Sequence, residues 1–440
     1  MSKIIGKISR LPKTLYEHKK KTIFFSFLGY LGADWVYRWD RNQTIRKKYA
    51  ELAVTFGQKT VSPEDRPKRI FVLVNVEGNS RGCFDAFNKY ALPLFHLAGV
   101  QVDVVKADNE AQLEALAGAV DTQEADVLYV VGGDGTIGKV VTGIFRNREK
   151  ATIPVGFYPG GYDNLWLKRM VPSVFERSED VRHACETAMA VIEDQKRSVF
   201  AFEMSIDEQG GAPEYGLGDV SAGWFRQIED TRKKFWYFSL AKRRWAYFWE
   251  MLKRSPSPIE CHVEYEETCS GCEKCRPKPV IEAPTWRWWH VLTGAPKYRN
   301  NDATRDFTGI VNEKCGEKHE LEAKGAEMLI ENEQKEDYSQ LRFRMGGADA
   351  GRFGVVADGW KRCSEGVVGR SVDEKAFYST DFEANAVSFK ISALPDYIHR
   401  LYVSSNPTPK DAVLTEKKVT IRGTQKKLDV FLPTAIRFEL

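Results

Sequence analysis

Val127-Leu128-Tyr129-Val130-Val131-Gly132-Gly133-Asp134-Gly135-Thr136 is the stretch that decides the fold of this 440-residue chain. The five uncharged residues 127–131 predict a strand that is buried on both faces. Three glycines then allow a tight turn, and a helix is expected to begin near Ile137. A buried strand that leads through a glycine turn into a helix is typical of a parallel α/β sheet.

The neighbouring segments repeat this alternation of strand and helix. Short apolar runs predict further buried strands at 70–74 and 153–158, and Val100–Val105 is expected to be another strand of the sheet. A helix interrupted at Pro93 is expected after the first strand, and Asn109 is expected to cap the helix that runs to Val120. Pro63 and Pro67 indicate a linker. The pattern predicts an α/β lobe over about residues 60–195.

The glycine turn has the composition of a phosphate-binding loop. Ligands of parallel sheets bind beyond the carboxyl ends of the strands, where this turn lies. Glycines let backbone N–H groups approach phosphate oxygens, and Thr136 adds a hydroxyl at the start of the helix. Asp134 can hold a metal-bound water or polarise an attacking hydroxyl. The alternative is a βα turn that binds nothing, but five specific residues in this context favour the phosphate site.

Gly132–Thr136 between a strand and a helix resembles the catalytic domain of diacylglycerol kinases, which sphingosine and ceramide kinases share. Over nearly the whole chain the sequence is most similar to the mitochondrial acylglycerol kinases of that family. Five further matches carry the resemblance: His96–Val100 together with Val104–Lys106, Val140–Gly143, Ile153–Phe157, Trp236-Tyr237 and Asp429–Pro433. The resemblance implies a two-lobed fold, with the α/β nucleotide-binding lobe followed by a β-sandwich lobe over 196–440 and lipid entering between them.

The same resemblance implies ATP and Mg²⁺ as cofactors and assigns roles to individual residues. Asp134 is the expected catalytic residue, and it would assist Mg²⁺ or the acceptor hydroxyl. The expected nucleotide-binding residues are Asn75, Gly132, Gly133, Gly135, Thr136, Gly161 and Asn164.

Several positions depart from the family pattern. Lys139 stands where the family has Glu, and Gln227 stands where it has a lipid-contacting Asp. Arg422-Gly423-Thr424 aligns with an acidic turn, and Val76 replaces a proline after the first strand. A charge pair at about 4 Å contributes roughly 4 kcal/mol at an effective dielectric constant of 20. Losing one such contact could slow phosphoryl transfer by about a thousandfold.

Three nearby acids could compensate for these losses: Asp163, Glu229 and Asp230. The alternative is a scaffold protein that has lost catalysis. We favour the hypothesis that the chain is an active kinase.

The first 50 residues are strongly basic. They contain twelve Lys or Arg and three Asp or Glu, whereas residues 51–440 carry a net charge of −5. Residues 22–33 form an apolar run that would reach only about 18 Å as a helix, short of the bilayer core. The aromatic and basic residues at 35–48 suit a bilayer interface. We therefore expect a membrane-associating segment, with a mitochondrial presequence or an ordinary packed helix as alternatives.

The remainder of the chain is predicted to be rich in strands, with insertions at about 224–330. Candidate strands are Ser198–Glu203, Gln340–Arg344, Arg352–Ala357, Ser388–Ile391 and Val419–Arg422. Residues 224–254 alternate aromatic and basic side chains in a helical pattern, which fits a membrane surface, a lipid pocket or simple core packing equally well. The block Trp286–His290 is expected to anchor an insertion.

Three cysteines follow a metal-binding spacing. Cys269, Cys272 and Cys275 could share one zinc ion, with Cys261 or His262 completing the shell. A disulfide with a spare thiol and unmodified thiols remain the alternatives. The other cysteines, at 83, 185, 315 and 363, are expected to be small buried residues.

The sequence therefore predicts an ATP-dependent lipid kinase. The expected acceptor is diacylglycerol or monoacylglycerol, or else ceramide or sphingosine. The resemblance implies a mitochondrial location, at the inner membrane or on its intermembrane-space side. It also implies a second hypothesis, a membrane-bound subunit of an inner-membrane translocase or assembly complex. A soluble NAD-kinase-like enzyme, which shares the glycine turn, is disfavoured by the N-terminal segment, and the acidic body argues against nucleic-acid binding.

Overall fold

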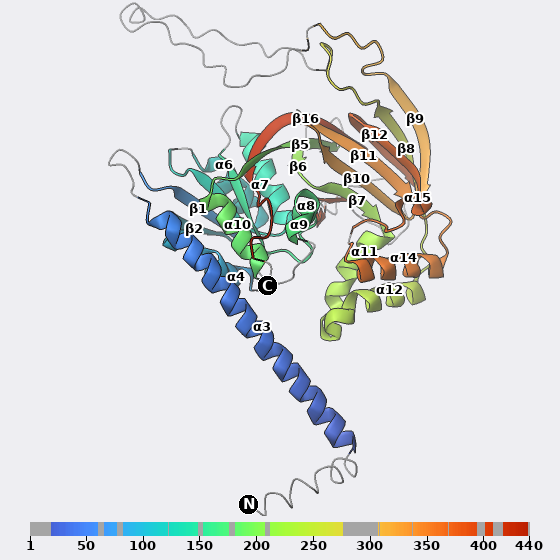
Figure 1. Cartoon of the computed structure of the whole chain (residues 1–440). Helices are drawn as coiled ribbons and strands as arrows, with labels where there is room; N and C mark the ends of the chain where they lie inside the picture. Colours follow the sequence, from blue (N-terminus) through green and yellow to red (C-terminus); the bar gives the residue numbers. More distant parts are fainter. Residues whose placement is uncertain are drawn as a thin grey trace, which may run out of the picture.

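The chain folds into two lobes with one long helix projecting from the first (Figure 1). The computed structural model describes residues 19–59, 66–76, 82–121, 123–147, 153–175, 181–206, 212–275, 307, 309–336, 338–367, 369–393, 401–407 and 417–438. An α/β lobe lies beside an all-β lobe, which confirms the predicted fold class. Residues 1–18 and the block Trp286–His290 lie outside the described residues.

Four parallel strands make the sheet of the α/β lobe. They are β1 (Arg69–Asn75), β2 (Gln101–Ala107), β3 (Val127–Gly132) and β4 (Val155–Pro159), in the spatial order β2-β1-β3-β4. Each overlaps one of the predicted strands. β3 is buried throughout, as an uncharged strand between two helical layers should be.

Helices cover both faces of this sheet. On one face lie α6 (Glu110–Ala119) and α7 (Asp134–Asn147), and on the other α4 (Cys83–Tyr90), α5 (Leu92–Leu97) and α10 (Arg182–Ile192). Asn109 caps α6 as predicted, because its side-chain oxygen accepts a hydrogen bond from the Gln112 amide at 2.8 Å. The short helices α8 (Leu165–Met170) and α9 (Pro172–Phe175) follow β4.

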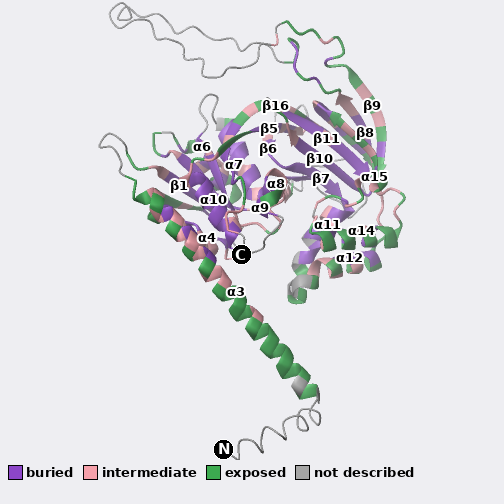
Figure 2. Ribbon diagram, viewed as in Figure 1, coloured by how far each residue is buried: buried purple, intermediate pink, exposed green. Residues whose placement is uncertain are grey.

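The long projecting helix is α3 (Lys19–Gly57), and it has two different halves. Near its C-terminal end Ile45, Tyr49 and Ala53 are fully buried at four-residue spacing, against α5 and α10. The Tyr49 hydroxyl donates a hydrogen bond of 2.5 Å to the buried carboxylate of Glu186. The N-terminal half is exposed and extends away from the lobe (Figure 2). Among the described residues, no helix has an apolar stretch long enough to cross a membrane.

The second lobe is a β-sandwich that shares a sheet with the first. β16 (Lys418–Phe431) pairs in parallel with β4 at Val430 and Phe431, and it continues the sheet into antiparallel strands. These are β5 (Lys196–Ile206), β6 (Glu214–Gly216), β8 (Ile259–Glu266), β9 (Lys318–Gly325) and β13 (Ala386–Ala393). The opposing sheet contains β7 (Asp219–Gly223), β10 (Glu327–Gln334), β11 (Ser339–Gly346), β12 (Tyr378–Ala384), β14 (Tyr402–Val403) and β15 (Asn406–Pro407). Four of the five predicted strands of this region are confirmed.

The fifth prediction was wrong. Arg352–Ala357 is not a strand but the start of the helix α14 (Arg352–Glu365), which packs on α12 (Lys242–Lys253). The buried positions 355, 356, 359 and 362 follow a helical period rather than an alternating one.

The aromatic and basic segment 224–254 is three consecutive helical pieces. α11 (Trp224–Thr231) leads into the 3₁₀ helix η2 (Arg232–Ala241) and then into α12. Trp224, Phe225 and Tyr247 are buried with α14 in a separate small core, so part of this segment is ordinary packing. Tyr237 and Trp249 are exposed.

Candidate active site

The glycine turn connects the end of β3 to the start of α7, and it contacts the end of the neighbouring strand β1. α7 begins at Asp134, three residues earlier than predicted, so Asp134 and Thr136 lie in its first turn. The side-chain amide of Asn75, at the end of β1, donates a hydrogen bond of 3.1 Å to the Thr136 hydroxyl. The backbone amides at the helix start and the Thr136 side chain therefore gather at the carboxyl edge of the sheet, where phosphate would bind.

A second turn, after β4, packs directly against the first. A Cβ atom placed on Gly133 would lie 2.8 Å from the Cα of Gly161, far inside van der Waals contact. Gly135 is similarly closed to a side chain by Asn406, whose side-chain amide donates a hydrogen bond of 2.6 Å to the Gly135 carbonyl. Glycine is required at 133 because the backbone of the second turn approaches too closely for any side chain, and a side chain at 135 would displace Asn406.

Asn164 holds the second turn in shape. It adopts a left-handed backbone conformation with φ 47° immediately before α8. Its side-chain oxygen accepts a hydrogen bond of 2.9 Å from the Gly161 amide, and its side-chain nitrogen donates to the Gly161 carbonyl at 3.2 Å. The predicted residues Gly161 and Asn164 therefore lie beside Gly132–Thr136, with Asn164 engaged in shaping the turn.

Asp134 connects the two turns. Its two carboxylate oxygens accept hydrogen bonds from the backbone amides of Leu165, at 2.8 Å, and Trp166, at 3.1 Å. Burial raises the pKa of the Asp134 carboxyl to about 6, although the two amide donors oppose this shift. The negative charges of Asp219 and Asp163 raise the pKa further. The carboxylate is thus ionised near neutral pH but close to its titration range.

Substituting Gly133 with alanine should disrupt both turns. We expect Gly133→Ala to lower the free energy of unfolding by about 1–3 kcal/mol, because the added methyl group overlaps backbone that cannot move independently. Denaturant unfolding measures this loss. The matched control is Gly354→Ala in α14, where a Cβ would meet only the Ala350 side chain at 3.7 Å. Equal stability of Gly133→Ala and wild type would contradict the close packing of the turns.

Two of the three acids that were predicted to compensate for the substituted acidic positions form ion pairs with arginines. The Asp163 carboxylate lies 2.7 Å from Arg243 and 3.1 Å from Arg232. Glu229 lies 2.9 Å from Arg243 and 2.6 Å from Arg232, and all four side chains are largely buried. This set of four residues, the Asp163–Glu229 cluster, links the turn after β4 to α11, η2 and α12. The side chain of the third acid, Asp230, is outside the described part of the structure.

The structure adds an acid that the sequence analysis missed. Asp219 is buried at the start of β7, and its charge acts on Asp134. Burial raises the pKa of Asp219, while the positive charges of Arg169 and Arg226 oppose the rise. In the sequence, Asp219 stands directly before the uncharged run Val220–Gly223, and this was the available signal.

A turn of the β lobe that the sequence did not indicate contacts the glycine turn. It comprises Ser404, Ser405 and Asn406, and both serines have positive φ angles, 45° and 71°. The Ser404 amide donates a hydrogen bond of 2.7 Å to the Asp219 carbonyl. Together with the Asn406 bond to Gly135, this contact places a turn without a carboxylate against the loop.

Arg422, by contrast, lies in β16 and not in a turn beside the loop. Its exposed guanidinium is 3.7 Å from Glu266. β16 meets β4 at Val430 and Phe431, about 26 Å further along an extended strand. Because the two strands are parallel, the residues of β16 that precede Val430, Arg422 among them, extend away from the carboxyl edge of β4. Lys139, in α7, lies 3.8 Å from each of Glu110 and Glu214. Two neighbouring acids thus offset the charge of Lys139.

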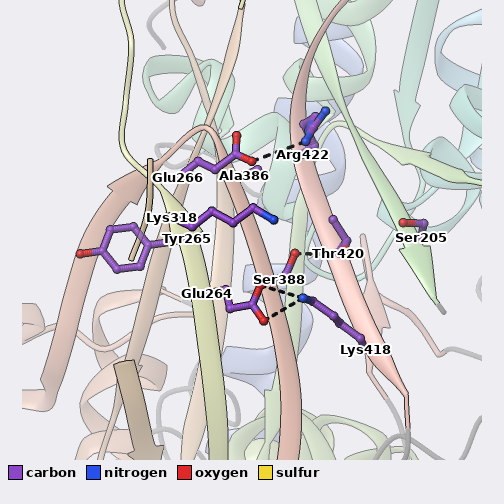
Figure 3. A pocket seen from close by; sticks show the side chains of 10 residues that line it. All are labelled: Ser205, Glu264, Tyr265, Glu266, Lys318, Ala386, Ser388, Lys418, Thr420 and Arg422. Atoms are coloured by element: carbon purple, nitrogen blue, oxygen red, sulfur yellow. Dashed lines mark hydrogen bonds and ion pairs between the residues drawn. The ribbon is translucent and has the colours of Figure 1, made fainter. Parts of the chain in front are cut away.

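A hollow of about 240 Å³ lies on the outer face of the shared sheet (Figure 3). Ion pairs between Lys418 and Glu264 at 2.7 Å and between Arg422 and Glu266 cross it. The strands that line it turn their apolar side chains to the sandwich core on the opposite face. This charged lining does not suit an acyl chain, and we assign the hollow no role.

Comparison with known proteins identifies relatives of the region that holds this site. Residues 69–199 match the model of the diacylglycerol kinase catalytic domain. An uncharacterised protein of Caenorhabditis elegans is 83% identical over 440 residues, the full length of both chains. The mitochondrial acylglycerol kinase of Xenopus laevis is 29% identical over 265 residues, which span 59% of this chain and 60% of that one. A solved structure of a diacylglycerol kinase from Bacillus anthracis is 10% identical, with a TM-score of 0.45, and covers 85% of this chain and 100% of that one.

Proposed function

Because the chain belongs to the diacylglycerol kinase catalytic domain family of lipid kinases, we propose that it transfers a phosphoryl group from ATP to the free hydroxyl of an acylglycerol. The products are phosphatidic acid from diacylglycerol and lysophosphatidic acid from monoacylglycerol. The acylglycerol class is supported by the Xenopus laevis relative. The observation that carries the proposal is the buried Asp134 carboxylate between two glycine turns at the carboxyl edge of the sheet.

The residues present fit ATP and Mg²⁺. Glycine at 133 and 135 lets the turn after β4 and Asn406 pack closely against the loop, and the loop leads into the N-terminus of α7, where backbone amides favour phosphate oxygens. Asp134 and Asp219 are two buried acids whose charges repel each other, and a divalent cation relieves such repulsion. Bound Mg²⁺ would neutralise charge on the phosphates during transfer.

The chain's own groups would bind the phosphates and position the cation or the acceptor hydroxyl. The α7 amides and the Thr136 hydroxyl, oriented by Asn75, hold phosphate oxygens. Asp134, fixed by the Leu165 and Trp166 amides, either holds the cation or accepts a hydrogen bond from the acceptor hydroxyl. Phosphoryl transfer depends mainly on such positioning, so rigid backbone contacts to Asp134 favour catalysis.

Turnover by the purified full-length chain tests the proposal. ATP and Mg²⁺ are supplied with diacylglycerol, monoacylglycerol, ceramide or sphingosine in mixed micelles, and labelled phospholipid is measured. We expect product from an acylglycerol at a rate far above that of the Asp134→Asn variant. If no acceptor gives more product with wild type than with the variant, the kinase proposal is rejected.

A membrane surface is the second partner we propose, with α3 as the contact. Its exposed N-terminal half carries large apolar side chains at Ile23, Phe24, Phe25, Phe27 and Leu28, and also at Tyr30, Leu31, Trp35, Val36, Tyr37 and Trp39. Three lysines open the helix, at positions 19–21. Basic and aromatic side chains on one helix favour an interface that contains anionic lipid.

Removing three of these side chains should weaken vesicle binding. The triple variant Phe24→Ser, Phe25→Ser, Phe27→Ser loses about 1 kcal/mol of apolar burial per residue, so we expect roughly hundredfold weaker binding. Sedimentation with vesicles of phosphatidylcholine and an anionic phospholipid measures it. The control is Val104→Ser on the edge strand β2, which is also exposed. Unchanged binding of the triple variant would exclude α3 as the contact.

The relative's name also supports a mitochondrial location, which we propose at the inner membrane or its intermembrane-space side. The Asp163–Glu229 cluster favours a second function, a non-catalytic subunit of an inner-membrane translocase or assembly complex. In this cluster the carboxylates of Asp163 and Glu229 form ion pairs with arginines, so they are not free to assist catalysis. Equal rates for wild type and Asp134→Asn, together with membrane partners that co-purify with both, would support this second function.

A further inference from the structure

Four cysteines meet where β8 ends and the edge strand β9 begins. Cys269, Cys272 and Cys275 follow β8, and Cys315 precedes β9. The two strands are antiparallel and Glu266 pairs with Lys318, so the chain that leaves β8 lies beside the chain that enters β9. The four sulfur atoms all lie within 4.8 Å of one another, and all but Cys275 are buried.

Cys315 is the fourth member of this cluster, which corrects the sequence analysis. It was expected to be an isolated buried residue, and Cys261 or His262 was expected to complete the shell. Both of those residues lie within β8, where side chains alternate between faces. Cys261 points into the sandwich core, with its sulfur 3.6 Å from that of Met345, and His262 lies 2.8 Å from Glu322 on the other face.

The distances fit one tetrahedral ion. The sulfurs of Cys272 and Cys275 are 3.7 Å apart. Zinc–sulfur bonds of about 2.3 Å arranged tetrahedrally give sulfur–sulfur separations of about 3.8 Å. A disulfide would need about 2.05 Å. The structure describes all eight cysteines, and none is in a disulfide.

Hydrogen-bond donors near the cluster stabilise the negatively charged thiolate form of its sulfurs. The Cys272 backbone amide donates to the Cys275 sulfur at 3.4 Å, and the Asn312 side-chain amide donates to the Cys269 sulfur at 3.4 Å. The Lys274 ammonium group, 2.6 Å from the Cys315 carbonyl, ties the two halves of the cluster together and brings a positive charge to it. Such donors orient thiolate ligands and offset the negative charge of a four-thiolate site.

We propose that Cys269, Cys272, Cys275 and Cys315 bind one structural Zn²⁺. Four sulfur ligands in a tetrahedron select zinc or iron. A four-iron cluster places its thiolates on different iron atoms, and therefore further apart than these sulfurs lie. All four positions of the ion are filled by protein, so the site is structural rather than catalytic. The ion would hold the chain that leaves β8 against the chain that enters β9.

Metal analysis of the full-length chain tests this inference independently of kinase activity. We expect one zinc ion per purified chain, and cobalt substitution should give the visible spectrum of a tetrahedral tetrathiolate site. Cys315→Ser should lower zinc affinity at least tenfold. Cys363→Ser, which alters a half-buried cysteine of α14 outside the cluster, should retain full zinc content.

The variant Cys315→His distinguishes loss of a zinc ligand from misfolding of the Cys315→Ser variant. Histidine can replace one thiolate in a zinc site, so this variant should keep its metal, and its cobalt spectrum should shift to shorter wavelength. Wild-type protein without zinc whose cysteines are in disulfides would overturn the proposal. So would iron in place of zinc, or a Cys315→Ser variant that binds zinc as tightly as wild type.

Discussion

Replacing Asp134 with asparagine is expected to lower phosphoryl transfer by about a thousandfold. The substitution removes one negative charge beside the phosphates, and a charge pair at about 4 Å contributes roughly 4 kcal/mol at an effective dielectric constant of 20. It also leaves a single oxygen to accept the amide hydrogens of Leu165 and Trp166. Single-turnover and steady-state rates with an acylglycerol acceptor measure the loss. A rate within tenfold of wild type would show that Asp134 does not act in the reaction.

Unfolding measurements separate the lost activity of Asp134→Asn from a loss of stability, and they also test the raised pKa of Asp134. Because burial raises the pKa to about 6 in the folded state, ionised Asp134 reduces stability above that pH. Wild type should therefore gain stability relative to Asp134→Asn as the pH falls from about 6 to about 4, by roughly 3 kcal/mol for the full shift. Denaturant unfolding of both proteins across this range measures the difference. Near-neutral stability of the variant close to that of wild type assigns its lost activity to chemistry.

Replacing Arg243 with alanine is expected to cost about 3 kcal/mol of the free energy of unfolding. Arg243 contacts both Asp163, at 2.7 Å, and Glu229, at 2.9 Å, and its side chain is 15% exposed. Its removal leaves two largely buried carboxylates with only Arg232 between them, and an unpaired buried charge is more costly than the pair is stabilising.

The neighbouring residue provides the control for this prediction. Arg244 lies on the same helix, and its guanidinium contacts only the exposed Ser364 hydroxyl among the hydrogen bonds of the described side chains. We expect Arg244→Ala to cost less than about 1 kcal/mol. Similar losses for the two variants would show that the Asp163–Glu229 cluster does not contribute through its ion pairs.

Local patterns in the sequence were sufficient for the α/β lobe. Uncharged, mainly apolar runs give strands where a sheet is covered on both faces, and such runs make up β3, β4 and residues 70–74 of β1. Asn109 caps a helix because its side chain reaches an amide three residues away. The same reasoning failed at Arg352–Ala357, which was expected to be a strand. Packing against α12 selects a helix there.

The sequence by itself therefore determined the glycine turn at Gly132–Thr136 and the buried strand that precedes it, because these depend on contacts between near neighbours in the chain. Only the tertiary structure decided what surrounds the turn. Asp219, Asn406 and Arg243 reach the site or its edge from elements far along the chain, and Cys315 joins its three partners across forty residues. Strand pairing and lobe packing set these contacts, and neither leaves a periodic signal in the residues that it brings together.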